Sequence, residues 1–461
     1  MRKEKDSMGE MYVPDDAYYG AQTQRAIENF QISNFTLSKS MIDALAIVKR
    51  SAAIANYQLG LIDKNIKNAI INSSDEIIEG KFDNQFLIDI FQTGSGTSSN
   101  MNCNEIISNR ASEIMGGSIG TKKPVHPNDH VNLGQSSNDV IPTAIHIAAN
   151  TLIENKLIPS LQLLEKELEK KSFEFKDIIK IGRTHLQDAT PITLGQEFSG
   201  YLHMIKNSIT RIKNTQKLMS ELAIGGTAVG TGINTHTKFG SIVALEVSKY
   251  TKINFVEASN HFEAQGAQDA AVEVSGALKS IAVSLSKIAN DIRWLGSGPR
   301  AGLGELILPA VQPGSSIMPG KTNPVICESV IQACAQVIGN DLAITIGGQG
   351  GVFELNLMLP LIAHNLTTSI SILANSATAF TQKLIIDLKA NKDKCSSYIE
   401  GSLAMCTSLA PLIGYDKAAE IAYEAYRTGK TVRQIAEENN VLDQEKLNTT
   451  LDPKSMIEPN K

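Results

Sequence analysis

The residues best suited to chemistry lie in one loop, residues 314–324, which reads Gly-Ser-Ser-Ile-Met-Pro-Gly-Lys-Thr-Asn-Pro. This loop joins two adjacent hydroxyls, of which Ser316 is the second, to the Lys321 cation and the Asn323 carboxamide. Asn323 followed by Pro324 is typical of the cap and first residue of a helix, whose positive end attracts anions. An ordinary glycine- and proline-rich surface turn has a similar composition. A functional interpretation therefore depends on whether other segments repeat the pattern.

Three other segments repeat it. They are Thr-Gly-Ser-Gly-Thr-Ser-Ser-Asn at 93–100, Gln-Ser-Ser-Asn-Asp at 135–139 and Gly-Arg-Thr-His-Leu-Gln-Asp-Ala-Thr-Pro at 182–191. Each precedes an apolar run of helical period, so we expect four polar turns at four helix N-termini. Helix capping accounts for one or two hydroxyls in a turn, but not for so many. If the turns converge, they would surround a small dianion with neutral donors and one lysine.

Histidines supply the candidate bases. His185 lies inside the 182–191 segment, and Glu328 lies one turn into the helix expected after residue 324. A histidine that is hydrogen-bonded to a glutamate is an oriented base, although a lone histidine is more often structural. A second cluster, His-Pro-Asn-Asp-His at 126–130, contains metal-ligating residue types. Its proline and tight spacing favour a secondary anion site or a structural turn over a complete coordination shell.

We expect neither a metal nor a cofactor. The chain has five cysteines, an odd number without a Cys-x-x-Cys pair. This spacing disfavours a zinc site and a disulfide framework. An iron–sulfur cluster would need at least three of the thiolates to converge. Buried or half-buried free thiols are the favoured interpretation.

Long helical runs must position these segments. The clearest run has apolar residues at 274, 278, 281, 285, 288, 292 and 295, in the alternating steps of four and three that packed, nearly parallel helices show. Similar runs cover 194–212 and 153–168, and Pro159 is expected to kink the latter or to mark its start. Looser helical patterns follow Pro324 and extend over 357–388.

These runs predict a mostly α fold. We expect a mixed, mostly helical N-terminal domain at 1–137, a central five-helix bundle at 138–390 and a small helical C-terminal domain at 391–461. Because a long bundle keeps apolar sides, a homo-oligomer is favoured over a monomer whose apolar seam is satisfied internally.

Bulk composition narrows the class of partner. The chain has 461 residues, 42% of them hydrophobic, and a net charge of −5, with no long basic block. We therefore expect no nucleic acid and no membrane as a partner. The charged start at residues 1–6 lacks an apolar signal core and contains acidic residues, so we expect a cytoplasmic protein.

Taken together, the motifs resemble those of the class II fumarases, within the wider fumarase/aspartase superfamily of lyases that release fumarate. The resemblance extends nearly from end to end, from residues 4–9 and 20–25 to 414–419. The Gly-Ser-Ser loop marks the superfamily. The segment Thr-His-Leu-Gln-Asp at 184–188 is narrower, because aspartate ammonia-lyases typically carry glutamine at the position of His185.

The resemblance implies a cofactor-free, reversible hydration of fumarate to (S)-malate in the tricarboxylic acid cycle, by anti addition through an aci-carboxylate intermediate. It implies that Ser316 removes the C3 proton of malate and that His185, oriented by Glu328, acts at the C2 hydroxyl. It also implies a three-domain, mostly helical subunit, a homotetramer with a helical core, and active sites that are each shared by three subunits.

The same resemblance assigns the binding residues. The expected substrate-binding residues are Ser95, Gly96, Thr97, Ser136, Ser137, Asn138, Thr184, Ile317, Lys321, Thr322 and Asn323. The expected secondary carboxylate site comprises Lys123, His126, Pro127, Asn128 and Asp129.

The chain departs from the family pattern at three places: Ser98 where glutamine is frequent, Leu133-Gly134 where Lys-Ser is common, and Lys123 where an arginine often serves the secondary site. The alternatives are aspartate ammonia-lyase or another fumarate-releasing lyase of the superfamily, and a retained fold with a structural role. His185 disfavours aspartate ammonia-lyase, and the intact set of Ser316, Lys321, Asn323, His185 and Glu328 disfavours a non-catalytic protein.

Overall fold

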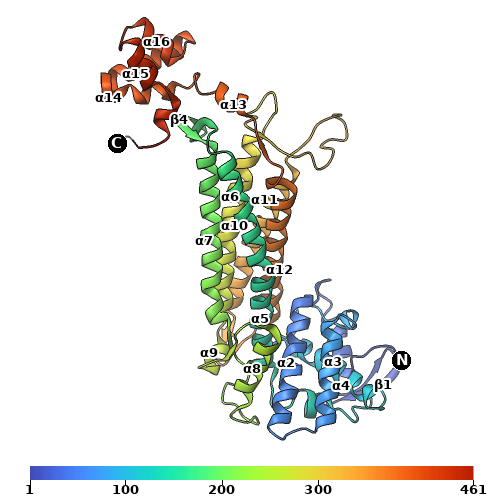
Figure 1. Ribbon diagram of the computed structural model, residues 1–461. Coiled ribbons are helices and arrows are strands. Elements are labelled where there is room, and N and C mark those ends of the chain that lie inside the picture. The colour runs from blue at the N-terminus through green and yellow to red at the C-terminus, as the bar shows by residue number, and fades with distance from the viewer. Residues whose placement is uncertain (460–461) are drawn as a thin grey trace. The chain divides into compact units, whose positions relative to one another are not determined.

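The computed structural model describes residues 1–459, and these are mostly helical (Figure 1). They form two compact units assembled from interleaved segments. Unit 1 comprises residues 1–159, 210–282 and 333–374, and unit 2 comprises residues 160–209, 283–332 and the described residues from 375 onward. In the described part of the chain, five long helices contain a boundary between the units: α6 (Ile158–Glu174), α7 (Leu194–Met219), α10 (Asp269–Leu295), α11 (Val325–Gly348) and α12 (Leu359–Phe380).

Unit 1 is built around α2 (Lys39–Gln58), an alanine-rich helix that packs mainly against three others. Its neighbours are α3 (Lys64–Ile78), α5 (Ser137–Leu152) and α8 (Phe239–Thr251). The small side chains on α2 allow this close approach on several faces. The unit also contains α1 (Ala21–Asn29), α4 (Thr97–Ile114), α9 (His261–Gly266), and the short helices η1 (Asp83–Gln85), η2 (Pro127–Val131) and η3 (Ile153–Leu157).

The strands of unit 1 are short two-stranded pairs. β1 (Arg2–Asp6) pairs antiparallel with β2 (Gly9–Val13), and β8 (Gly351–Val352) pairs antiparallel with β9 (Leu355–Asn356). β5 (Glu221–Leu222) pairs parallel with β6 (Val256–Glu257). Such pairs close loops and contribute little core of their own.

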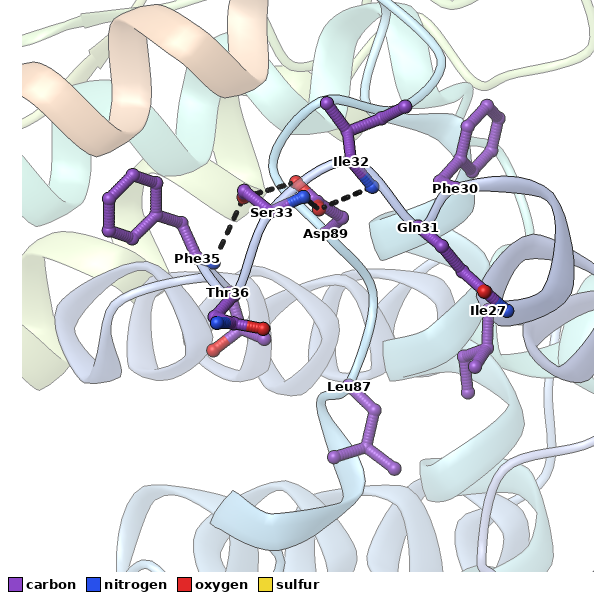
Figure 2. Close-up of a pocket in the computed structure, with 10 residues that line it drawn as sticks. Ile27, Phe30, Gln31, Ile32, Ser33, Phe35, Thr36, Leu87 and Asp89 are labelled. Atoms are coloured by element: carbon purple, nitrogen blue, oxygen red, sulfur yellow. Dashed lines mark hydrogen bonds between the residues drawn. The ribbon is translucent and has the colours of Figure 1, made fainter.

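The loop between α1 and α2 lines a cavity of about 610 Å³, together with Ile27 of α1 and with Leu87 and Asp89 (Figure 2). The Asp89 carboxylate holds the loop by accepting hydrogen bonds from the backbone N–H groups of Ile32 and Ser33 and from the Ser33 hydroxyl. Burial by itself would raise the pKa of Asp89, but these donors and the backbone N–H of Phe91 keep that pKa below its usual range.

Unit 2 combines a hairpin with a helical C-terminal cluster. β3 (Ile179–Thr184) pairs antiparallel with β4 (Gln187–Thr193), and β7 (Leu306–Ile307) with β10 (Lys389–Ala390). Ile181 of the hairpin is buried in the same core as Leu409, Ile421 and Ile435. The cluster contains α13 (Lys392–Ser397), α14 (Ala410–Ile413), α15 (Tyr415–Thr428), α16 (Val432–Glu438) and α17 (Gln444–Thr450), with η5 (Leu403–Ser408) and η6 (Pro453–Met456). The short helix η4 (Thr381–Ile385) directly continues α12.

The sequence predicted the long helices correctly. The apolar residues at 274–295 all lie on α10 and are buried in the single chain, as are those predicted for α7. Pro159 is the second residue of α6, which follows the π-helical segment η3 without a break in the helical backbone, so this proline lies at an irregularity within a longer helix. The mostly helical fold is confirmed, whereas the division into three domains, with boundaries at 137/138 and 390/391, stays a prediction.

Two local predictions were wrong. Residues 182–191 do not form a polar turn at a helix N-terminus but make up most of the β3–β4 hairpin, while α7 begins at Leu194, the first apolar residue of the predicted run. Asn323 does not cap α11, which begins at Val325, one residue later than predicted; the backbone N–H of Glu328 bonds to the carbonyl of Pro324. The Asn323 amide instead donates to the Gly314 carbonyl at 2.7 Å and closes the base of the loop.

One helix of the described residues, α11, is long and apolar enough to cross a membrane by length and composition. Core helices of soluble proteins pass the same test, so this observation is weak evidence for a membrane span. Its apolar residues Ile338, Leu342 and Ile346 are 41%, 63% and 52% exposed in the single chain. Their spacing of four residues places them on one face of the helix. An exposed apolar stripe of this kind is typical of a surface that is buried against another protein.

Candidate active site

The turn before α4 presents its hydroxyls as a linked pair. Ser95 is buried, and its Oγ lies 2.8 Å from Thr97 Oγ1. Gly96 caps the helix with a φ of +71°, a left-handed conformation that glycine adopts without strain. The departure at Ser98 is accommodated locally, since its Oγ lies 3.2 Å from Thr93 Oγ1.

The turn before α5 is a complete capping box. The Ser136 side chain caps the helix start, and the Asp139 carboxylate accepts from the Ser136 backbone N–H at 2.9 Å. Asp139 also accepts from the N–H groups of Gly225 and Thr227, which ties the turn to the 225–234 loop. Burial raises the pKa of Asp139 to about 6, so the carboxyl is ionised at neutral pH.

These two turns meet within unit 1. The amide of Asn100, on α4, donates to Ser137 Oγ at 3.0 Å. Because that oxygen accepts from Asn100, the Ser137 proton is free to be donated elsewhere. A cavity of about 380 Å³ opens beside the turn, lined by Ser136, Ser137, Gln135 and Asn234 among others. The geometry offers neutral hydroxyl and amide donors, as a small carboxylate requires.

The glycine of the Leu133-Gly134 departure has a structural reason, whereas nothing in the structure explains Leu133. Gly134 has a φ of +74°, and a Cβ at this position would lie 2.8 Å from Thr235 Oγ1. A serine at position 134 would therefore be strained and crowded in this chain.

His185 lies at the tip of the β3–β4 hairpin in unit 2. His185 and Leu186 form a two-residue turn with φ values of +57° and +61°, the signs of a type I′ turn. Asparagine and glycine normally occupy such turns, so a histidine and a leucine here store backbone strain. Thr184 and His185 are exposed. His185, Lys180, Arg183 and Lys287 line a cavity of about 480 Å³.

A buried charge cluster anchors this hairpin. Arg183 donates to both oxygens of Glu305, at 2.7 and 3.0 Å. Lys180 Nζ lies 3.5 Å from Glu305 Oε2 and 3.0 Å from Glu197 Oε2. The Glu305 side chain is completely buried, so its bidentate pairing with Arg183 is shielded from solvent. The pairing fixes the strand two residues before His185.

The 314–324 loop separates the roles of its two serines. Ser315 Oγ accepts from the backbone N–H groups of Ile317 and Met318, at 3.2 and 2.9 Å, and so shapes the loop. Among residues 1–459, the exposed Ser316 side chain makes no hydrogen bond. Lys321 and Thr322 are also exposed, and Ile317 is 83% exposed. The loop thus presents Ser316 and Lys321 outward.

The 126–130 segment is a structured turn. His126 Nδ1 accepts from the backbone N–H groups of Asn128 and Asp129 at 3.2 Å each. Burial lowers the pKa of His126, which agrees with a neutral, accepting imidazole, so its 3.3 Å approach to Asp129 is not an ion pair. Lys123, Asn128 and Asp129 are exposed, while Pro127 is buried. In the described part of the chain, no group of acidic, histidine and cysteine side chains has the arrangement of a metal site.

The motifs fall into two sets. Segments 93–100, 126–130 and 135–139 belong to unit 1, while the hairpin and the 314–324 loop belong to unit 2. Within unit 2, the described residues show no hydrogen bond between His185 and Glu328. The predicted His185–Glu328 pair is therefore not formed within this single chain. The roles of the predicted site residues stay predictions.

Five residues that support the motifs were not among the predicted site residues. In unit 1, Lys49, Asn100 and Asn132 support the Ser136 turn, and in unit 2, Arg183 and Glu305 anchor the hairpin. Arg183 and Asn100 lie within or beside the polar motifs, so their polarity was visible. Lys49 and Glu305 lie far away in sequence, and their burial could not be inferred from local pattern.

Comparison with known proteins identifies the family. A family model described as "Lyase" matches residues 9–339, and one described as "Fumarase C C-terminus" matches residues 405–458. Fumarate hydratase class II of Nitrosomonas europaea is 50% identical over 457 residues, 99% of each chain. The chain belongs to the class II fumarate hydratase family. It is accordingly a hydro-lyase, and the expected family resemblance is confirmed.

Other members of the family agree. Human mitochondrial fumarate hydratase is 51% identical over 460 residues, 99% of this chain and 90% of the relative. The crystal structure of class II fumarase from Schistosoma mansoni matches with a TM-score of 0.97 and 40% identity, covering 100% of both chains. A fumarate lyase:delta crystallin structure from Brucella melitensis, bound to cobalt, matches with a TM-score of 0.94 and 46% identity over 99% of this chain and 100% of that chain.

Proposed function

We propose that this protein catalyses the reversible hydration of fumarate to (S)-malate. The observation that carries the proposal is the match over 99% of the chain, at about half identity, to relatives named fumarate hydratase. His185 favours this reaction over the aspartate ammonia-lyase alternative, in which glutamine typically occupies that position. The activity belongs to the tricarboxylic acid cycle, and we propose a cytoplasmic location.

The chemistry follows from the groups that each motif presents. In the dehydration direction, Ser316 as an alkoxide takes the C3 proton of malate, and the electron pair moves into the neighbouring carboxylate. Lys321 and the hydroxyl donors of the Ser95 and Ser136 turns stabilise this dianionic aci-carboxylate. His185, as general acid, protonates the C2 hydroxyl, which leaves as water. The absence of other partners for the Ser316 hydroxyl within residues 1–459 supports its assignment as the reacting serine.

We further propose a homotetramer whose active sites each combine residues of three subunits. Two observations support it. The apolar stripe of α11 at Ile338, Leu342 and Ile346 is exposed in the single chain and suits burial against another copy. His185 and Glu328, proposed as an oriented pair, share no hydrogen bond within the described chain, so their partners are expected from neighbouring subunits.

A direct assay tests the reaction. Purified protein without added metal or reductant should convert malate to fumarate, followed by ultraviolet absorbance, and should not act on aspartate. Activity towards aspartate alone would establish the alternative lyase. Activity that disappears with a chelator or on exposure to oxygen would contradict the proposed site, because no step in it needs a metal or an iron–sulfur cluster.

A further inference from the structure

Lys49 is a fully buried cation without a carboxylate hydrogen-bond partner. It lies on α2, and its side chain is completely inaccessible to solvent. Its Nζ donates to Asn132 Oδ1 and to Gln135 Oε1, each at 2.9 Å, and both acceptors are neutral carboxamides. A buried charge is costly unless it is paired. Stability therefore does not explain why a buried lysine lies beneath the Ser136 turn.

The contacts of Lys49 lead to the Ser137 hydroxyl through three successive hydrogen bonds. Asn132 Oδ1, which Lys49 orients, also accepts from the amides of Asn100 and Asn104, each at 3.2 Å. The Asn100 amide donates in turn to Ser137 Oγ. Gln135, the other acceptor, lines the 380 Å³ cavity together with Ser136 and Ser137. Lys49 therefore fixes which end of each carboxamide faces inward, and through them the direction of the Ser137 proton.

We propose that Lys49 is a positioning residue for the dicarboxylate, which it attracts as a buried positive charge and for which it orients the donors of the Ser136–Ser137 turn. This inference rests on the proposed function, because it takes that turn to be the carboxylate site. The charge acts through a medium of low dielectric, where it is weakly screened by salt. The matched class of ligand is a small dianion.

The electrostatic surroundings of Lys49 make the effect measurable. Burial lowers the pKa of Lys49 to about 8. The titratable groups acting on it are Cys103 on α4, whose thiol pKa burial raises to about 12, and Asp139 on α5, ionised above about pH 6. Between pH 7 and 9.5, Lys49 is thus the member of this group that changes charge.

The test compares Lys49→Met with wild type in calorimetric binding of succinate, a dianion that cannot be dehydrated, and of crotonate, a monoanion. We expect Lys49→Met to weaken succinate binding about tenfold and crotonate binding about threefold. The electrostatic attraction between Lys49 and the ligand scales with ligand charge, so the monoanion loses half the binding free energy that the dianion loses. Lys171→Met is the matched control, since Lys171 is also buried but donates to Glu174 and to the Leu388 carbonyl. It should leave succinate affinity unchanged.

A pH profile on the unmutated protein makes the test independent of how the variant folds. Wild-type succinate affinity should fall between pH 7 and 9.5, towards the value of Lys49→Met, as Lys49 loses its proton. Lys49→Met should show no such fall. A wild-type affinity that stays constant over this range, or a variant with wild-type affinity, overturns the inference while fumarate hydration stands. A wild-type protein that neither hydrates fumarate nor binds succinate overturns the proposed function as well.

Discussion

At the scale of single residues, the role of each hydroxyl follows from what its oxygen already accepts. Ser315 Oγ accepts two backbone hydrogen bonds and is committed to the shape of its loop. Ser137 Oγ accepts from Asn100 and keeps its proton for a ligand. Within the described residues, the Ser316 side chain neither accepts nor donates a hydrogen bond. Its hydroxyl is therefore available to lose its proton, as the proposed base must.

Replacing Ser316 should separate chemistry from binding. Ser316→Ala should lower kcat by roughly 10² to 10⁴ with little change in KM, because the alkoxide acts in the transition state. Exchange of the malate C3 proton with solvent deuterium, followed by NMR, should be lost with turnover. His185→Asn should also abolish turnover while slow C3 exchange persists.

Ser315→Ala provides the matched comparison on the same loop. It removes the acceptor for two backbone N–H groups, so it should disturb loop order and raise KM as well as lower kcat. Slow C3 exchange that survives in Ser316→Ala but not in His185→Asn would mean that the two residues have each other's role.

At the scale of elements, the β3–β4 hairpin holds His185 in a backbone conformation that the turn alone disfavours. The strain is offset by the Arg183–Glu305 pairing and by the burial of Ile181 in the C-terminal core. The hairpin is therefore positioned from two directions, by charge and by packing.

Breaking the buried Arg183–Glu305 ion pair should lower the free energy of unfolding far more than breaking an exposed ion pair. Glu305→Gln leaves Arg183 and Lys180 without their common carboxylate and should destabilise the protein by about 3 to 5 kcal/mol. Turnover should fall with it, because the strand before His185 loosens. Glu438→Gln, which breaks the exposed pair with Lys430, should cost less than about 1 kcal/mol.

Urea unfolding at pH 7 measures both changes. Equal and small losses for the two variants would show that the Glu305 cluster does not anchor the hairpin. Retained stability combined with lost turnover would show that Glu305 acts on the chemistry directly.

The sequence predicted elements better than contacts. The period of α7 and α10 is a local property, so the helices and their buried residues were predicted correctly. The hairpin at 182–191 was missed because His-Leu lacks the Asn-Gly signature of a type I′ turn, and its polar residues resemble a helix start. Lys49 and Glu305 were missed because burial of a charge depends on segments distant in sequence.

At the scale of the whole molecule, the site motifs are divided between two units and the α11 stripe is uncovered in the single chain. Assembly of several subunits would bury the α11 stripe and would bring motifs of different chains together. The apolar residues at 274–295 are already buried within the chain, so they are not available as a subunit interface. The exposed stripe on α11 is the candidate interface.

Mixing two inactive variants tests shared sites. His185→Ala and Ser316→Ala chains, unfolded and reassembled together, should recover roughly a quarter of wild-type activity if these residues come from different subunits, since random assembly gives a site both intact groups in one case of four. Each variant reassembled alone should stay inactive.

The same mixing in a Leu342→Glu background is the control. A charge in the α11 stripe should prevent association, as analytical ultracentrifugation would show, and no activity should return. Mixed tetramers that form in the first experiment but remain wholly inactive would rule out sites shared in this way.

The two-residue turn at His185 and Leu186 also limits which insertions and deletions the gene can tolerate. The turn places Thr184 opposite Gln187 and Arg183 opposite Asp188, and the register shifts once between Ile181 and Arg183. A further residue added to or deleted from a strand shifts the pairing again and turns the side chains beyond it to the opposite face. Arg183 would then lose Glu305, and Ile181 would lose its place in the core. Insertions and deletions between codons 179 and 193 should therefore be strongly selected against.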